Sequence, residues 1–329
     1  MDLSIGIDIS KEYFDICNFD GKNYSYMTYN NTNEGINGFI KELNKIKKDK
    51  DLLITMEATG IYHLKVAIKL NTKGFSVSVV NPLIIKRYSQ MKMRRVKTDK
   101  ADSKIIAEYG YNEPSYPFIQ KSEDRQKVEL MLKGLEDFIL LKNELSNRLE
   151  ALKNNPYKCK EVEDAINNTI CFVIENIKKL EDELENFVKK NFNEEYERLL
   201  EIPAVGKRIA SLVIGFFGTF DVFENSKQVS SFIGINPSPK ESGSSYRGKS
   251  NISKKGNGYM RKMFYLASLS AARYNPKCKE LYMRLLARGK LKKVALIAVA
   301  NKLIKQIFAI VKYRREFDVN YVEKSREKF

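Results

Sequence analysis

Residues 3–29 of this chain read LSIGIDISKEYFDICNFDGKNYSYMTY, and they decide the fold of its first part. The segment contains three runs rich in β-branched and aromatic residues, at 3–9, 13–18 and 24–29, which predict strands. Gly21, in the sequence Asp-Gly-Lys, marks a hairpin turn between the second and third runs. Three strands in such quick succession predict a sheet that begins antiparallel.

Helices and strands alternate after this segment. The sequence predicts a helix from Asn33, a strand at 52–56 that ends at Glu57, a helix from Ile61, and a strand at 75–80 that Asn81-Pro82 stops. Residues 97–104, KTDKADSK, open a further helix. The order βββαβαβα predicts a mixed sheet with helices on its faces, the arrangement of ribonuclease H-like domains.

Four carboxylates come together in this arrangement. Asp8 ends the first strand and Glu57 the fourth, while Asp99 and Asp102 lie on one face at a helix start. Ligands of such sheets bind where strand ends meet helix starts. Oxygen ligands favour Mg²⁺ or Mn²⁺, and two such ions about 4 Å apart would activate a nucleophile and stabilise the leaving oxygen of a phosphodiester.

Each of these acidic residues also has a purely structural interpretation. Asp99 and Asp102 are suited to cap a helix and to offset its dipole. Asp8 could cap a turn with Ser10, and Glu57 could pair with a lysine. The convergence of three separate segments favours the metal site.

The composition points to a polyanionic partner. The chain has 329 residues and a net charge of +17, enough length for two domains and connecting helices. Residues 201–329 hold 26 of the 58 Lys and Arg but 9 of the 41 Asp and Glu, so the first 200 residues carry 32 of each. A neutral first part joined to a basic second part suggests DNA, RNA or anionic lipid as partner.

Cysteine and histidine contribute little to the predicted chemistry. The four cysteines are far apart and form no CxxC motif, which argues against structural zinc and disulfides and fits a reduced cytoplasm. The single histidine, His63, lies in a helical pattern and is predicted to be a packing residue. We expect no signal peptide and no membrane partner, because the longest apolar run, near 209–217, is far below the roughly 20 residues of a membrane span.

Residues 121–198 predict a coiled-coil helical hairpin. Heptad-like apolar seams run through 128–152 and 166–187, and Asn154-Asn155-Pro156 separates them. The pattern fits both an antiparallel pair within one chain and an arm for oligomerisation.

Residues 199–329 predict a mostly helical domain with two elements suited to phosphate. The sequence IPAVGKRIA at 202–210 is similar to a helix-hairpin-helix element, in which Lys207 and Arg208 would add charge; a plain packing corner fits as well. A loop rich in Gly and Ser follows at 234–257, and it is suited either to grip phosphate or to serve as a linker. The candidate nucleic-acid-binding residues in and after it are Lys240, Arg247, Lys249, Lys254, Lys255, Arg261 and Lys262.

The motifs of both halves resemble one family. They are GIDISK (6–11), EATGIY (57–62), VNP (80–82) and KTDKAD (97–102), then PAVG (203–206), GINP (234–237), SG (242–243) and ISKKGN (252–257). In this order they resemble the DEDD transposases of the IS one-ten insertion-sequence family over nearly the whole chain. Two departures are Ser103 and Met260, where alanine and leucine are commoner.

The resemblance implies the fold and the site. It implies a RuvC-like domain at 1–120 that carries Asp8, Glu57, Asp99 and Asp102, the coiled-coil connector at 121–198, and a transposase domain at 199–329. Ser242 corresponds to the family's serine nucleophile, although Ser244 and Ser245 lie close to it.

The resemblance also implies a recombinase that excises and inserts its element, guided by a structured bridge RNA, on donor and target DNA in the bacterial cytoplasm. Such enzymes are expected to work as homotetramers, dimers of dimers, whose active sites combine domains of different subunits. Two alternatives stay open from the residues themselves. One is a metal-dependent, junction-resolving nuclease that uses water as its nucleophile; the other is a non-catalytic nucleic-acid scaffold.

Overall fold

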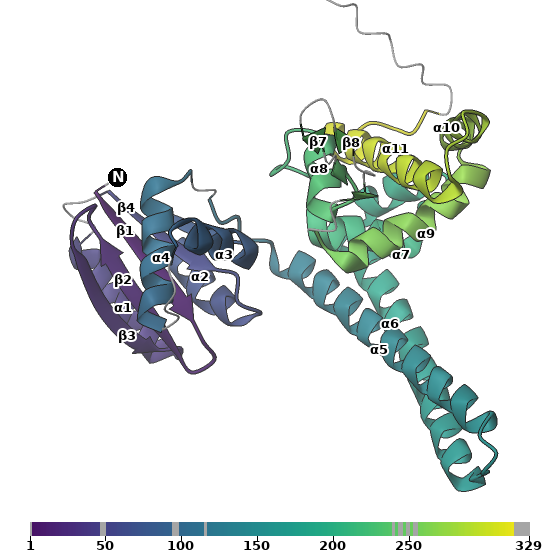
Figure 1. Cartoon of the computed structure of the whole chain (residues 1–329), viewed down its shortest axis with the longest axis horizontal. Helices are drawn as coiled ribbons and strands as arrows, with labels where there is room; N and C mark the ends of the chain where they lie inside the picture. The colour runs from purple at the N-terminus through teal and green to yellow at the C-terminus, as the bar shows by residue number, and fades with distance from the viewer. Residues whose placement is uncertain are drawn as a thin grey trace, which may run out of the picture. The chain divides into compact units, whose positions relative to one another are not determined.

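The computed structural model describes residues 2–46, 51–93, 99–114, 117–238, 241–242, 246–247, 251–252 and 256–318 (Figure 1). For Asp99 and Ser242, and for the other residues of the short strands between 237 and 251, only the backbone is described. The chain forms two compact units, residues 1–121 and 122–329. The predicted division into three domains stays a prediction.

The first unit contains a five-stranded mixed sheet in the order β3-β2-β1-β4-β5. Its strands are β1 (Leu3–Ile9), β2 (Tyr13–Phe19), β3 (Tyr24–Asn30), β4 (Leu52–Glu57) and β5 (Val77–Val80). The first three pair antiparallel, whereas β4 pairs parallel with β1 and β5 parallel with β4. Gly21 has a φ of 93° in the turn between β2 and β3, as its residue type predicted. The predicted mixed sheet is confirmed.

Helices cover both faces of this sheet (Figure 1). On one face, α1 (Asn33–Ile46) and α2 (Tyr62–Thr72) share a core with β1, in which Ile5 and Ile7 are fully buried. On the other face, α4 (Asp99–Asn112) packs through Ala107 on β2. Full burial of an Ile side chain contributes about 1.5–3 kcal/mol to the stability of the folded state. A one-residue slip in the register of β1 would turn every such side chain to the opposite face of the sheet. The alternation therefore fixes which residues face α4.

The helix α3 (Pro82–Met91) was not predicted from the sequence. Asn81-Pro82 does end β5, but it also begins this helix: the Asn81 side chain accepts a hydrogen bond from the Leu83 backbone N–H at 2.9 Å, and Pro82 occupies the first helical position. Ile85 and Tyr88 of α3 are buried against Ile105 and Ile106 of α4. The helix α3 therefore packs on α4 and helps to hold it in place.

The second unit begins with two long helices that pack against each other as a hairpin (Figure 1). They are α5 (Glu123–Lys153) and α6 (Lys160–Leu200). Where the pair meets the C-terminal helices, Leu132 and Val188 are fully buried in the common core. Farther along the hairpin, Leu140 is 51% exposed and Phe172 65% exposed. The hairpin therefore leaves apolar side chains exposed, and coiled-coil packing stays a prediction.

Arg125 holds the start of α5 against a kink in α6. Its guanidinium donates hydrogen bonds to both carboxylate oxygens of Glu195, at 2.9 and 3.1 Å, and to the Ile214 carbonyl oxygen at 2.9 Å. It also lies over the ring of Phe192, where the backbone of α6 leaves helical geometry. A bidentate pair of this kind fixes orientation as well as contributing energy.

Helices also form most of the remainder of the unit. They are α7 (Lys207–Leu212), the π-helical turn η1 (Val213–Phe217), α8 (Ser226–Ile233), α9 (Gly258–Tyr274), α10 (Pro276–Ala287) and α11 (Lys292–Tyr313). Asn225, Asn257 and Asn275 cap α8, α9 and α10 by accepting hydrogen bonds from backbone N–H groups. These caps give α9 a defined start at the end of the serine-containing segment.

The helix α11 is long and apolar enough to cross a membrane by length and composition alone. Val299, Leu303 and Ile307 are, however, fully buried among the other helices of the unit. We therefore assign α11 as the core helix of this unit.

A strained alanine lies in the turn between α6 and α7. The Val205 N–H donates to the Ile202 carbonyl oxygen at 2.9 Å, and Ala204 has a φ of 80°. With Pro203 at the second position, this is the geometry of a type II turn, which favours glycine at the third. A non-glycine residue in this region costs about 1–2 kcal/mol.

We expect Ala204→Gly to stabilise the protein by about 1 kcal/mol, because relief of the strain exceeds the added freedom of the unfolded chain. The midpoint of chemical denaturation measures this. Ala151→Gly, at an exposed position inside α5, is the matched control, and it should lower the free energy of unfolding by about 1 kcal/mol. Equal losses in both variants would mean that Ala204 is not strained.

Candidate active site

The ends of β1 and β4 place two of the predicted carboxylates beside each other. Gly6 pairs with Thr55 and Ile7 with Met56, so the parallel register continues to Asp8 and Glu57. Both follow the alternation of the residues that face α4, because side chains two apart on a strand share a face. The sequence prediction that these two strand ends meet at one edge is confirmed for the backbone.

The helix α4 approaches this edge unusually closely. A Cβ atom at Gly6 would overlap the backbone of Ser103 and Ala107. The Ser4 hydroxyl donates a hydrogen bond to the Ala107 carbonyl oxygen at 2.8 Å, and a Cβ at Gly110 would overlap the side chain of Thr55. Only small residues on both elements allow such an approach. The contact thereby fixes the position of α4 along β1.

The direction of α4 brings its start toward the end of β1 that carries Asp8. Ser103 lies against Gly6 and Gly110 lies toward Ser4, so the helix runs opposite to β1. Asp99 is four residues before Ser103, or about 6 Å along a helix, and Asp8 is two residues after Gly6, or about 6.6 Å along a strand. The start of α4, which carries Asp99 and Asp102, therefore lies toward the end of β1 that carries Asp8.

The described side chains do not by themselves enclose a metal ion. Among them, no group of three carboxylates, imidazoles or thiols is close enough to bind one. The side chain of Asp99 is not in that set, and Lys97 and Thr98 of the predicted motif lie outside the described residues. The donor chemistry nevertheless fits a hard cation, because the side chains at this edge offer only oxygen ligands.

A further carboxylate at this edge was missed in the sequence. Asp15 of β2 pairs directly with Asp8 across the antiparallel ladder, and its Oδ1 accepts a hydrogen bond from the Thr28 hydroxyl at 2.5 Å. Like charges directly opposite each other destabilise a sheet. The alternation in residues 13–19, where Phe14 and Ile16 are apolar, could have placed Asp15 on the same face as Asp8.

His63 is a packing residue, as predicted. It is 7% exposed, on the face of α2 that carries the buried Val66 and Ala67. Burial lowers the pKa of His63, although a hydrogen bond with the Thr59 backbone partly opposes this. The imidazole is therefore neutral at pH 7.

The Gly/Ser-rich composition predicts a loop for the segment that contains Ser242, but the structure shows short strands in it. Two short antiparallel ladders pair β6 (Pro237–Ser238) with β9 (Asn251–Ile252) and β7 (Glu241–Ser242) with β8 (Tyr246–Arg247). One pair lies inside the other along the chain, so we call the four strands β6, β7, β8 and β9 together the serine arm. Ser242 pairs with Tyr246 and Glu241 with Arg247. Lys240, Lys249, Lys254 and Lys255 lie outside the described residues.

Arg261 holds the two ends of this segment together. Its guanidinium donates hydrogen bonds to the Ile233 carbonyl oxygen at 3.2 Å and to that of Gly256 at 3.5 Å. Gly234, which has a φ of 82°, lies against Gly256, where a Cβ would overlap its backbone. Arg261 therefore supports the arm structurally, while Lys262 beside it is exposed.

The basic residues of the predicted helix-hairpin-helix element are paired within the chain. The Lys207 Nζ lies 2.6 Å from Glu185 Oε2, and Arg208 forms an ion pair with Glu181. Both acidic partners belong to α6. A phosphate would have to compete with these carboxylates, and the nucleic-acid role of Lys207 and Arg208 stays a prediction.

Comparisons with known proteins agree with this architecture. A family model of DEDD type, described as a transposase, matches residues 5–152, and one described as the transposase IS116/IS110/IS902 family matches residues 196–283. A pilin gene-inverting protein of Moraxella lacunata is 29% identical over 322 residues, which cover 95% of this chain and 97% of that protein. The transposase for insertion sequence element IS1111A of Coxiella burnetii is 24% identical over 93% of this chain and 89% of its own length.

The mixed sheet with Asp8 and Glu57 near its strand ends is consistent with a ribonuclease H-like DEDD domain, and the matched proteins indicate an enzyme that cleaves and rejoins DNA. The chain belongs to the IS110 family of DEDD transposases.

Proposed function

We propose that this enzyme excises and inserts an insertion sequence under the guidance of a structured bridge RNA, acting on donor and target DNA in the bacterial cytoplasm. One observation carries the catalytic part of the proposal: the Gly6 contact holds α4 against β1 with its start toward Asp8, and β1 runs parallel to β4, which ends at Glu57. The basic residues of the second unit supply the affinity for nucleic acid, because each phosphate contact releases counterions.

Asp8, Glu57, Asp99 and Asp102 would hold Mg²⁺ or Mn²⁺ in this proposal. A divalent ion bound there would polarise a scissile phosphate and stabilise the charge on its oxygens. The protein's part is to hold the carboxylates in place through the packing of α4 on β1. The repulsion between Asp8 and Asp15 would be relieved by the same cation.

Ser242 is the proposed nucleophile. Its hydroxyl oxygen forms a bond to phosphorus, the bond from phosphorus to one bridging oxygen breaks, and that oxygen leaves as a sugar hydroxyl after taking up a proton. The serine proton passes to a carboxylate of the acidic site or to solvent. Rejoining reverses these steps on a different strand, and the phosphoserine conserves the bond energy, so no nucleotide cofactor is consumed.

The proposed assembly is a tetramer in which the serine arm of one subunit serves the acidic site of another. The exposed apolar side chains of the hairpin support self-association, since exposed apolar surface marks interaction sites. Besides Leu140 and Phe172, they include Leu130, Leu141, Val162 and Ile174.

The metal site can be tested without any activity. We expect Mg²⁺ at about 100 times its dissociation constant to stabilise the folded protein by about 2.7 kcal/mol, which corresponds to a rise of several degrees in the melting temperature. Asp8→Asn should abolish this rise. Glu42→Gln, which removes a half-exposed carboxylate of α1 that pairs with Lys45, should retain it. An unchanged melting temperature of the wild-type protein would count against a metal site.

The guide can be tested in vitro with RNA transcribed from the DNA that flanks the gene. We expect strand exchange between donor and target DNA to require this RNA and to follow its sequence when the RNA is altered. A scrambled RNA of equal length is the control. Exchange at the same sites without any RNA would refute the guidance, and cleavage without a protein adduct would favour the junction-resolving nuclease.

A further inference from the structure

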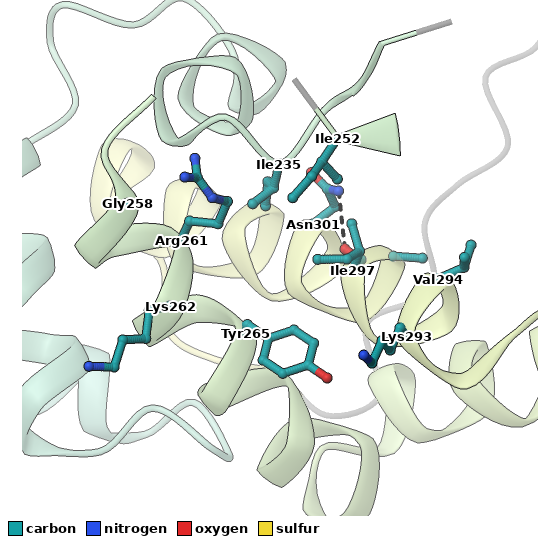
Figure 2. A pocket seen from close by; sticks show the side chains of 11 residues that line it. Ile235, Ile252, Gly258, Arg261, Lys262, Tyr265, Lys293, Val294, Ile297 and Asn301 are labelled. Carbon is teal, nitrogen blue, oxygen red and sulfur yellow. Dashed lines mark hydrogen bonds between the residues drawn. The ribbon is translucent and has the colours of Figure 1, made fainter. Parts of the chain in front are cut away.

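A cavity of about 680 Å³ opens between α9 and α11 at the base of the serine arm (Figure 2). Its walls are largely apolar, and Ile235, Ile252 and Ile297 contribute to them. The other lining residues are Gly258, Arg261, Lys262, Tyr265, Lys293, Val294, Ala298 and Asn301. None of these described residues is acidic. The cavity is within the size range of small-molecule sites.

The polar groups around the cavity match a negatively charged ligand. In the view of Figure 2, the ring of Tyr265 lies between Lys262 on one side and Lys293 on the other. Lys262 also interacts with Glu136 of α5: burial raises the pKa of that carboxyl group, and Lys262 partly opposes the rise. Arg261 is already bound to backbone carbonyls, and Lys262 extends away from Tyr265 in Figure 2, so Lys293 is the cation among the lining residues that remains for a ligand.

The start of α11 adds to this positive potential. Its first turn contains Lys292 and Lys293 but no acidic residue, and Leu291 provides no side-chain cap. Two lysines at a helix N-terminus are unfavourable for the helix dipole, whereas an anion there is favourable. Asn301 also lines the cavity, and its amide donates a hydrogen bond to the Ile297 carbonyl oxygen at 3.1 Å, which leaves Oδ1 as an acceptor.

We propose that this cavity binds one unstacked nucleotide of a single strand, with its base against the apolar wall and Tyr265 and its phosphate near Lys293. The inference rests on the proposed function, in that the strand is one handled by the adjacent serine arm. Every base has flat apolar faces, so the wall would accept any of them. Fixing one nucleotide here would set the register of the strand along the arm.

Binding of labelled single strands to the full-length protein tests this. The probes are an oligothymidylate, an oligouridylate and an abasic oligomer of the same length and charge. We expect the wild-type protein to bind at least one of the two base-containing probes about tenfold more tightly than the abasic one. Preference for the DNA or for the RNA probe would identify the source of the nucleotide.

Variants locate the effect at the cavity. Ala298→Trp should fill it and remove the tenfold preference while leaving abasic binding unchanged; Ala287→Trp, at an exposed position of α10, is the matched control. Val294→Glu, at a position that is 52% exposed, is a second variant that does not disturb the core and should weaken binding of the base-containing probes. Lys293→Ala should weaken binding of all probes and reduce the salt slope by roughly 0.7.

The inference is overturned if the abasic oligomer binds as tightly as the other probes, or if folded Ala298→Trp and Val294→Glu proteins keep the preference. Ser242→Ala should leave this binding unchanged. Failure of the serine chemistry and failure of the nucleotide site are therefore distinguishable.

Discussion

Ser242→Ala is expected to abolish the covalent adduct between the protein and DNA, and to reduce strand cleavage by a factor on the order of 10⁴ or more, because the remaining groups supply no bond to phosphorus. The adduct is measured as a DNA-dependent shift of the protein on a denaturing gel. Nucleic-acid binding should stay at the wild-type level, since alanine removes no charge.

Neighbouring hydroxyls provide the controls for this variant. Ser244→Ala and Ser245→Ala should retain the adduct, and so should Tyr246→Phe, although Tyr246 pairs with Ser242 in the arm. An adduct that persists in Ser242→Ala and disappears in one of the other three would move the nucleophile to that residue. Cleavage that persists with no adduct in any variant would favour water as the nucleophile.

Asp8→Asn is expected to reduce cleavage by about 10³-fold or more while leaving DNA binding unchanged. The substitution keeps the size of the side chain but removes a charged metal ligand, and a metal supplies several kcal/mol of stabilisation to the developing charge. Cleavage is measured at saturating DNA, and binding by the retention of labelled DNA. Circular dichroism establishes that the variant is folded.

Two companion variants distinguish catalysis from structure at this edge. Asp99→Ala should have the same effect as Asp8→Asn; loss of folding instead would favour the capping interpretation of Asp99. Asp15→Asn reports on the carboxylate that opposes Asp8. Near-wild-type cleavage by both Asp8→Asn and Asp99→Ala would contradict the acidic site.

Much of the first unit is predictable because its elements are local. The runs around Ile5 and Ile16 carry strand periodicity, and Gly21 carries its turn, so each element can be inferred from a few neighbouring residues. The same patterns place Asp8 and Glu57 at strand ends. The order of the elements then suffices to predict that these ends meet.

The parts that sequence reasoning missed depend on contacts between distant residues. The place of α4 is set by the absence of a side chain at Gly6, whose significance appears only when Ser103 and Ala107 are packed on it. Helix α3 was not predicted, because Asn81-Pro82 is equally typical of the end of a strand and of the start of a helix.

Ion pairs in the second unit also join residues that are far apart in the sequence. The ion pairs of Lys207 and Arg208 were not predicted, because their acidic partners, Glu185 and Glu181, lie more than 20 residues earlier, on a helix whose facing surface the sequence does not reveal. The ladder at Ser242 was likewise missed, because two-residue strands carry too little periodicity to detect.

In the proposed mechanism, carboxylates of the first unit and a serine of the second together cleave DNA. Mass spectrometry of the nuclease-trimmed reaction tests it most directly. The wild-type protein with Mg²⁺ is predicted to carry a DNA-derived phosphate on Ser242, and Asp8→Asn to carry none. Cleaved DNA with an unmodified Ser242, or the same modification in Asp8→Asn, would contradict the account.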